Sequence, residues 1–161
     1  SLWELSRDKR EMGVMKAETK LIELWLVSHR QHLELLDALE KRTRVIEIVR
    51  ICGGDEELIK EATPFLIKKE RVNRWHGTIQ GGRGSLKYTI RADGTFFEHL
   101  RKYDGFFRST PDKNAPFEVT DFGLDDVAFL DGGGAALFYT TTHEGYAYID
   151  PKLAVALSYH D

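Results

Sequence analysis

The sequence predicts an α+β domain, in which N-terminal helices pack on a curved antiparallel sheet of about five or six strands. Two observations predict it: apolar residues in the first half recur at helical spacing, and short β-type runs between glycine-rich turns follow Trp75. Residues 15–64 are expected to be mainly helical and residues 75–150 mainly β, within one domain over 15–161. Residues 1–14 are interpreted as a tag or a disordered leader, because Met12 and Met15 are both suited to begin a natural chain.

A leucine-rich stripe over residues 21–39 has the spacing of amphipathic helices. Ser28, with Gln31 three residues later, matches a capping box, in which the serine hydroxyl accepts from a backbone N–H of the first turn. The stripe therefore predicts one helix that ends near Val27 and a second that begins at His29.

The second helix is expected to run to Cys52, where a pair of glycines provides a stop. Residues 44–51 are rich in β-branched side chains, however, and suit a strand equally well. Asp55 is expected to cap a short helix over residues 56–62, which Pro64 ends.

Glycine-containing turns divide the second half into β-hairpins. An Asp-Gly pair is among the strongest hairpin signals, because a type I′ turn needs positive φ at both central residues. The predicted turns are Asp93-Gly94 between residues 86–92 and 95–101, Gly132–Gly134 between 127–130 and 135–142, and Glu144-Gly145 before 146–149.

The expected register brings aromatic and histidine side chains to one face of the sheet. A two-residue turn at Asp93-Gly94 places Tyr88 opposite His99, and one at Glu144-Gly145 places His143 opposite Tyr146. Aromatic rings with polar tips suit a protein-binding face or a small-molecule pocket, although helices could equally cover such a face. The predicted ligand or partner face consists of Tyr88, His99, Tyr139, His143, Tyr146 and Tyr148.

Charge is divided unevenly along the chain. Residues 65–102 contain nine Lys/Arg and three Asp/Glu, a net of +6, whereas residues 104–161 contain three and ten, a net of −7. The acidic C-terminal third predicts a solvated acidic patch at Asp121, Asp125 and Asp126. Such a patch would steer a basic partner and raise its association rate.

The basic stretch is the basis for an alternative function. Basic residues interleaved with an aromatic suit phosphate neutralisation and base stacking, which predicts a nucleic-acid or anion patch. The acidic chain, with a pI of about 6.1, argues against a nucleic-acid footprint. The patch comprises Lys68, Lys69, Arg71, Arg74, Trp75 and Arg83.

Catalytic and metal-binding motifs are not found. His29 and His32 are three residues apart with Arg30 between them, unlike the His-x-x-x-His spacing of zinc sites. Cys52 and the serines lack a nucleophile-elbow context. We therefore predict no catalytic residue, metal or cofactor, and the sequence favours a binding protein over an enzyme.

Two short stretches resemble known families. Trp75-His76-Gly77-Thr78, together with Ala92-Asp93-Gly94-Thr95-Phe96, resembles small lipocalin-like barrels. The order of helices before an antiparallel sheet is similar to nuclear-transport-factor-2-like proteins. Both resemblances imply a sheet-lined pocket for a small molecule, and neither assigns a catalytic residue.

The function expected from the sequence is a non-enzymatic binding module: a small, soluble cytoplasmic adaptor, inhibitor or immunity-type protein. It would act on a protein partner through the acidic third and the tyrosine-rich face. One alternative is a small-molecule-binding or enzymatic pocket on the sheet, and another is nucleic-acid binding through residues 68–91. No apolar run approaches the ~18 residues of a membrane span, and self-association through the N-terminal helices is a further expectation.

Overall fold

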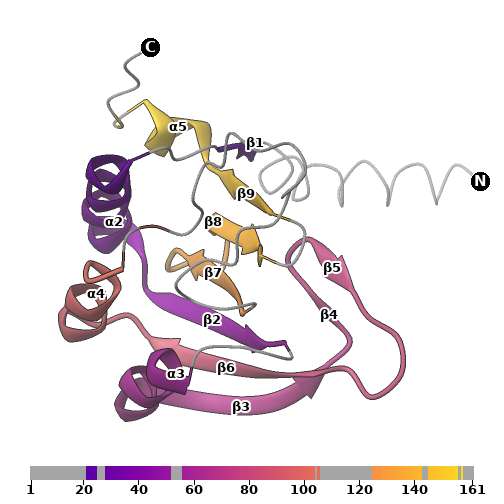
Figure 1. The fold of residues 1–161 in the computed structure, drawn as a ribbon. Coiled ribbons are helices and arrows are strands. Elements are labelled where there is room, and N and C mark those ends of the chain that lie inside the picture. Colours follow the sequence, from indigo (N-terminus) through magenta and orange to yellow (C-terminus); the bar gives the residue numbers. More distant parts are fainter. Residues whose placement is uncertain are drawn as a thin grey trace, which may run out of the picture.

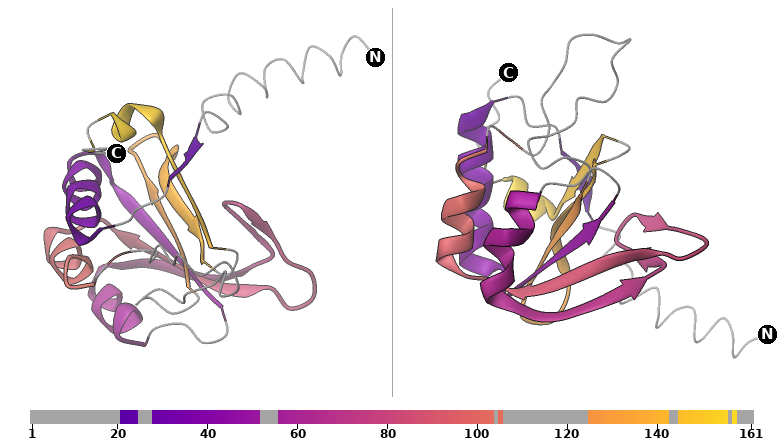
Figure 2. Two further views of the ribbon diagram at one scale, coloured as in Figure 1. Left: turned by 45° about the horizontal axis from the view of Figure 1, so that its top comes forward. Right: turned by 60° about the horizontal axis from the view of Figure 1, so that its bottom comes forward.

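The computed structural model describes residues 21–24, 28–51, 56–103, 105, 125–142, 145–155 and 157. These residues form an α+β fold, as predicted, with one seven-stranded antiparallel sheet and a separate two-stranded hairpin. The helices lie on one side of the large sheet, and the small hairpin lies on the other (Figures 1 and 2).

The elements follow the chain in an order that mixes helices and strands (Figure 1). They are β1 (Ile22–Glu23), α2 (His29–Arg42), β2 (Val45–Arg50), α3 (Glu56–Ala62), a 3-10 turn η1 (Thr63–Phe65), β3 (Leu66–Val72), β4 (Arg74–Trp75), β5 (Thr78–Ile79), β6 (Ser85–Arg91), α4 (Gly94–Leu100), β7 (Asp126–Leu130), β8 (Ala136–Thr141), β9 (Tyr146–Ile149) and α5 (Pro151–Ala154). The large sheet has the order β1-β9-β8-β7-β2-β6-β3, so β1 and β3 are its two edges and it stays open rather than closing into a barrel.

The predicted helix start at His29 is confirmed, because the Ser28 hydroxyl accepts from the Gln31 N–H at 3.2 Å. Helix α2 ends at Arg42 rather than Cys52, and the ambiguous stretch after it forms β2. In β2, Ile46, Ile48 and Val49 are buried and the other three residues are half-buried, as expected for a strand through the middle of a sheet.

Two further predictions of local structure are wrong. Residues 21–24 were expected in a helix, but Ile22 and Glu23 pair with Ile149 and Tyr148 as the edge strand β1. Asp93-Gly94 does not turn a hairpin: Asp93 caps α4 by accepting from the Thr95 N–H at 2.8 Å.

Helix α4 forms because three apolar residues follow Asp93 at helical spacing. A helix places Phe96, Phe97 and Leu100 together, and each is no more than 1% exposed. A strand would have placed Phe96 and Phe97 on opposite faces of the sheet. Burial of both rings on one side therefore outweighs the local preference of Asp-Gly for a turn.

The two C-terminal hairpins are confirmed. Strands β7 and β8 pair across Gly132–Gly134, where Asp131 Oδ1 accepts from the Gly133 and Ala135 N–H groups at 2.9 and 3.0 Å. Strands β8 and β9 pair with Thr141 opposite Tyr146, two residues away from the predicted register.

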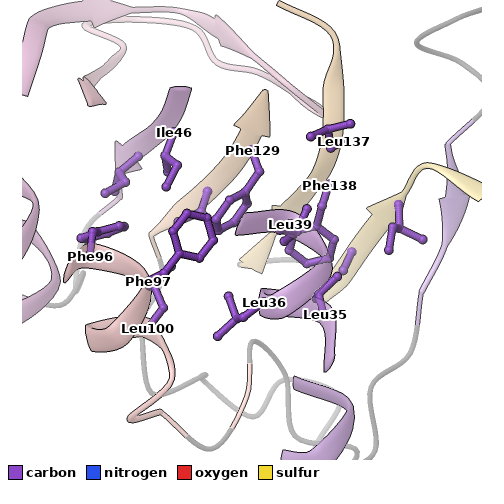
Figure 3. Close-up of a cluster of buried hydrophobic side chains, with 14 of the residues drawn as sticks. Leu35, Leu36, Leu39, Ile46, Phe96, Phe97, Leu100, Phe129, Leu137 and Phe138 are labelled. Carbon is purple, nitrogen blue, oxygen red and sulfur yellow. The ribbon is translucent and has the colours of Figure 1, made fainter. Parts of the chain in front are cut away.

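The core lies between the helices and one face of the sheet. The Phe129 ring is 5.9 Å from the Phe97 ring of α4 and 5.8 Å from the Phe138 ring of β8, so it joins the two layers (Figure 3). Leu35, Leu36 and Leu39 of α2 are fully buried in the same cluster. Burial of these side chains fixes which face of the sheet the helices cover.

Candidate functional site

The sheet face opposite the helices, called here the open face, is determined by alternation along the strands. Ile46, Ile48 and Phe129 point into the core, so their neighbours Glu47 and Ala128 point to the other side. The open face has a small apolar cluster of its own, in which Ala128, Leu130 and Ala136 are buried and Tyr139 packs against them. It is therefore partly apolar at the centre of the sheet.

Three tyrosines of the predicted partner face lie together on the open face. The Tyr139 and Tyr148 rings stack with centroids 5.1 Å apart, and the Tyr148 and Tyr146 rings are 6.4 Å apart. We call Tyr139, Tyr148 and Tyr146 the tyrosine row. Tyr139 and Tyr148 are half-buried and Tyr146 is 39% exposed, so the row runs from a covered end to an exposed end.

The covered end of the row lies under the β4–β5 hairpin. Its turn residue Gly77 has φ +79°, and a Cβ there would be 2.5 Å from Thr141 Cγ2 and 2.9 Å from Tyr139 Cε2. The His76 ring is 5.5 Å from the Tyr139 ring. Burial, followed by the nearby Tyr148, raises the pKa of Tyr139, so its phenol stays neutral over a wide pH range.

Replacing Gly77 with alanine is expected to weaken the contact of the hairpin with the sheet. Gly82 is a matched control, because it has φ +69° and no atom within 4 Å of a built Cβ. We expect Gly82→Ala to lower the free energy of unfolding by about 1 kcal/mol through backbone strain alone, and Gly77→Ala to lower it by about 1 kcal/mol more through the added contact. Urea denaturation of both variants measures the difference, and equal losses would contradict this packing.

Asp126 anchors the hairpin to the sheet. Its carboxylate accepts from Trp75 Nε1 at 2.9 Å and from the Thr142 N–H at 2.7 Å, and the residue is 2% exposed. Asp125 is fully buried, accepts from the Ile51 N–H at 3.2 Å, and lies 3.4 Å from Arg50 Nε. The solvated acidic patch predicted at these two residues is therefore wrong, because both carboxylates serve as buried structural acceptors.

Charged side chains continue the open face from Glu47 toward β3. Lys87 Nζ lies 3.0 Å from Glu47 and 3.4 Å from Glu70, while His76 Nε2 lies 3.9 Å from Glu47. Burial alone would lower the pKa of Lys87, but the Glu47 and Glu70 carboxylates outweigh it and raise that pKa. Lys87 therefore remains charged and links the central strand β2 to the edge strand β3.

Two further residues of the predicted face, Tyr88 and His99, do not join the tyrosine row. Tyr88 packs against the core on the helix side, and Lys69 Nζ lies 5.1 Å from its ring centroid. His99 is a buried residue of α4 whose Nε2 lies 3.0 Å from the Tyr103 hydroxyl. His143 of the predicted face and Asp121 of the predicted acidic patch lie outside the described residues.

The predicted basic patch divides into an exposed part and a covered one. Lys68, Lys69 and Arg71 are exposed on β3, Arg74 is exposed on β4, and Arg83 is exposed in the loop between β5 and β6. Trp75 points instead toward the sheet, where its indole N–H donates to Asp126. Its ring is therefore engaged within the fold rather than presented for base stacking.

A small-molecule cleft and a metal site are two other kinds of site that the described residues could form. The cleft between the hairpin and the sheet, lined by Glu47, Trp75, His76 and Asp126 among others, has a volume of about 10 Å³, which holds a single water at most. In the part of the chain that the structure describes, no group of three or more His, Cys, Asp or Glu side chains is arranged to hold a metal ion. His32, which the sequence pattern excluded as a zinc ligand, is buried, with Nε2 2.9 Å from the Leu100 carbonyl oxygen.

Sequence reasoning missed the roles of Gly77 and Glu47. Their roles depend on residues that are distant in the sequence. The alternation of residues 45–49 as Val-Ile-Glu-Ile-Val does, however, mark Glu47 as the polar position of a strand.

Comparison with family models, with curated proteins and with solved structures finds no match to this chain. Within the described ranges, no helix has both the length and the apolar character needed to cross a membrane.

Proposed function

We propose that this chain is a protein-binding module whose binding face is the exposed end of the tyrosine row together with the β4–β5 hairpin. The observation that carries the proposal is the continuous series of three tyrosine rings on the open face, with Tyr146 at its exposed end. Tyrosine is enriched at protein interfaces, because its ring provides a large apolar surface and its hydroxyl a hydrogen-bonding group.

Two further features support a protein partner. The β4–β5 hairpin lies on the same side of the large sheet as the tyrosine row (Figure 2), and its Ile79 is 74% exposed. The hydrogen bond from Trp75 to Asp126 and the close approach of Gly77 to Tyr139 keep the hairpin in a fixed position relative to the row. A preorganised surface loses less conformational entropy on binding than a mobile one.

The chemistry beside the row favours a basic contact residue on the partner. Glu23 is exposed and lies directly opposite Tyr148 in the β1–β9 pairing, so both side chains project from the open face. A guanidinium can stack on a tyrosine ring and form an ion pair with an adjacent carboxylate at the same time. We therefore infer that the partner presents an arginine between Tyr148 and Glu23.

The small-molecule alternative has less support. Pockets for small molecules typically enclose about 300–1,000 Å³ with mainly apolar walls, whereas the cleft beside His76 has about 10 Å³. A larger hollow of about 500 Å³ lies by α2 and α4, but Asp37, Glu40, Lys41 and Arg101 line it and all are charged. The cleft is therefore too small for such a ligand, and the larger hollow lacks apolar walls.

The test first identifies the partner and then replaces Tyr146 and its neighbour Tyr148 in the tyrosine row. A photo-crosslinking amino acid at position 146 is expected to capture a protein, while the same group at Val155, which is 86% exposed on the far helix side, is not. We then expect the combined Tyr146→Ala and Tyr148→Ala changes to weaken binding about thirtyfold, as for an interface hot spot.

The matched control is Val155→Ala, which removes an apolar side chain, 86% exposed, from the segment after α5. Binding of the same partner should be unchanged in this variant. If the tyrosine variant binds as tightly as the parent chain, or if the group at 146 captures no protein while one at 155 does, the proposed face is wrong.

A further inference from the structure

A second surface lies at the opposite edge of the sheet from β1. Strand β3 is the last strand of the order, and no strand of the described residues pairs with its outer side (Figure 1). Five of its seven residues are exposed, including Leu66 at 40% and Ile67 at 58%. The backbone N–H and C=O groups on its outer side therefore form a template to which another strand can add.

The side chains of this edge are mainly basic. Lys68, Lys69 and Arg71, called here the basic edge, accompany a single acidic residue, Glu70. Glu70 is already engaged, with its carboxylate 3.2 Å from Lys68 and 3.4 Å from Lys87. The edge thus presents a net positive charge to anything that approaches it.

The basic side chains flank the edge on both faces of the sheet. Lys69 and Arg71 pair with Tyr88 and Leu86 on the helix side, whereas Lys68 pairs with Thr89 on the open side. An added strand places its own side chains alternately on these same two faces. Carboxylates on such a strand would therefore meet a lysine or arginine on either face.

We propose that the outer edge of β3 binds an extended acidic peptide segment of a partner protein, which joins the sheet as an additional strand. Backbone hydrogen bonds would supply the alignment, and the basic edge would select acidic side chains. The exposed Leu66 and Ile67 at the start of the strand would accept apolar side chains from the peptide. This surface is separate from the tyrosine row and does not depend on the function proposed above.

The arrangement favours a peptide over a nucleic acid or a second copy. Phosphate backbones need cations gathered on one face, together with exposed rings. Here the cations are divided between two faces, the Trp75 indole donates to Asp126, and Lys69 lies over the Tyr88 ring. Pairing of β3 with β3 of another copy would bring two strands of net positive charge together, which is unfavourable.

The test uses labelled peptides of about seven residues, a length that suits one strand. One peptide alternates glutamate with valine, the second replaces every glutamate with lysine, and the third keeps the glutamates but has proline in place of each valine. A single-stranded thymidine oligonucleotide of the same charge is the fourth probe. Titration against the full chain at low salt is combined with amide hydrogen exchange of β3.

We expect the Glu-Val peptide to bind and to protect amides of β3 from exchange, while the lysine and proline peptides do not bind. The combined Lys69→Glu and Arg71→Glu changes should weaken this binding at least about tenfold. The control pair Lys41→Glu and Lys152→Glu alters net charge equally at exposed sites on α2 and α5, and should retain binding. Tyr146→Ala should also retain it, which separates this site from the tyrosine row.

Four outcomes would overturn the proposal. The first is that the proline peptide binds as tightly as the Glu-Val peptide, and the second is that the oligonucleotide binds more tightly than the Glu-Val peptide without protecting β3 amides. The third is that the chain dimerises and protects those amides without any peptide. The fourth is that the Glu-Val peptide does not bind at low salt.

Discussion

Phe129→Ala is expected to lower the free energy of unfolding by about 4 kcal/mol, the largest effect of any single change considered for this chain. The Phe129 side chain is fully buried and lies between the rings of Phe97 and Phe138. Its removal leaves a cavity between the helical layer and the sheet, and that cavity adds to the loss of apolar burial. Urea denaturation monitored by circular dichroism measures the change.

Val155→Ala is the control for Phe129, because Val155 is 86% exposed on the segment after α5. A change within about 0.5 kcal/mol is expected there. If Phe129→Ala cost no more than this control, helices and sheet would not share the core described for them.

Asp126→Ala is expected to lower the free energy of unfolding by about 3 kcal/mol. The substitution leaves the buried Thr142 N–H and the Trp75 indole N–H without the carboxylate that accepts from both. An orphaned buried donor costs about 1–3 kcal/mol. Asp126→Asn retains one acceptor oxygen, so we expect about half the loss.

Asp37→Ala provides the comparison for a surface carboxylate. Asp37 is 65% exposed in its ion pair with Arg101 at 2.9 Å, and such a pair contributes at most about 1 kcal/mol. A loss for Asp126→Ala as small as that for Asp37→Ala would mean that Asp126 does not hold the hairpin to the sheet. It would then support the solvated patch predicted from the sequence.

Local signals in the sequence were sufficient for several elements. The capping box at Ser28, the short helix over residues 56–62 and the glycine turn before β8 each depend on neighbours within a few positions, and all three form as predicted. The β-branched stretch after α2 was ambiguous, because a short apolar run gives no clear period. Pairing with β6 and β7 decides that it is a strand.

Tertiary contacts override the local signal where the predictions were wrong. Asp93-Gly94 is a strong turn signal, but the core has room for both Phe96 and Phe97 only if a helix follows. Residues 21–24 have helical spacing, yet β9 offers an edge with which β1 pairs. In both cases the structure is decided by contacts with residues that are distant in the sequence, the core for α4 and strand β9 for β1.

The candidate site was predictable only in part. Strand alternation correctly places Tyr139, Tyr146 and Tyr148 on one face, since an error of two residues in register does not change which face a side chain occupies. Docking of the hairpin was not predictable, because Trp75 and Asp126 meet across fifty-one positions. Adjacent aspartates are usually solvated, which is why the burial of Asp125 and Asp126 was also missed.

Hydroxyl-radical footprinting of the full chain, alone and with the cross-linked partner, tests the central claim most directly. The account predicts that the partner protects Tyr146, Tyr148 and Ile79 from oxidation and leaves Val155 unchanged. Protection of Val155 without protection of the tyrosines would contradict it, because the partner would then lie away from the open face.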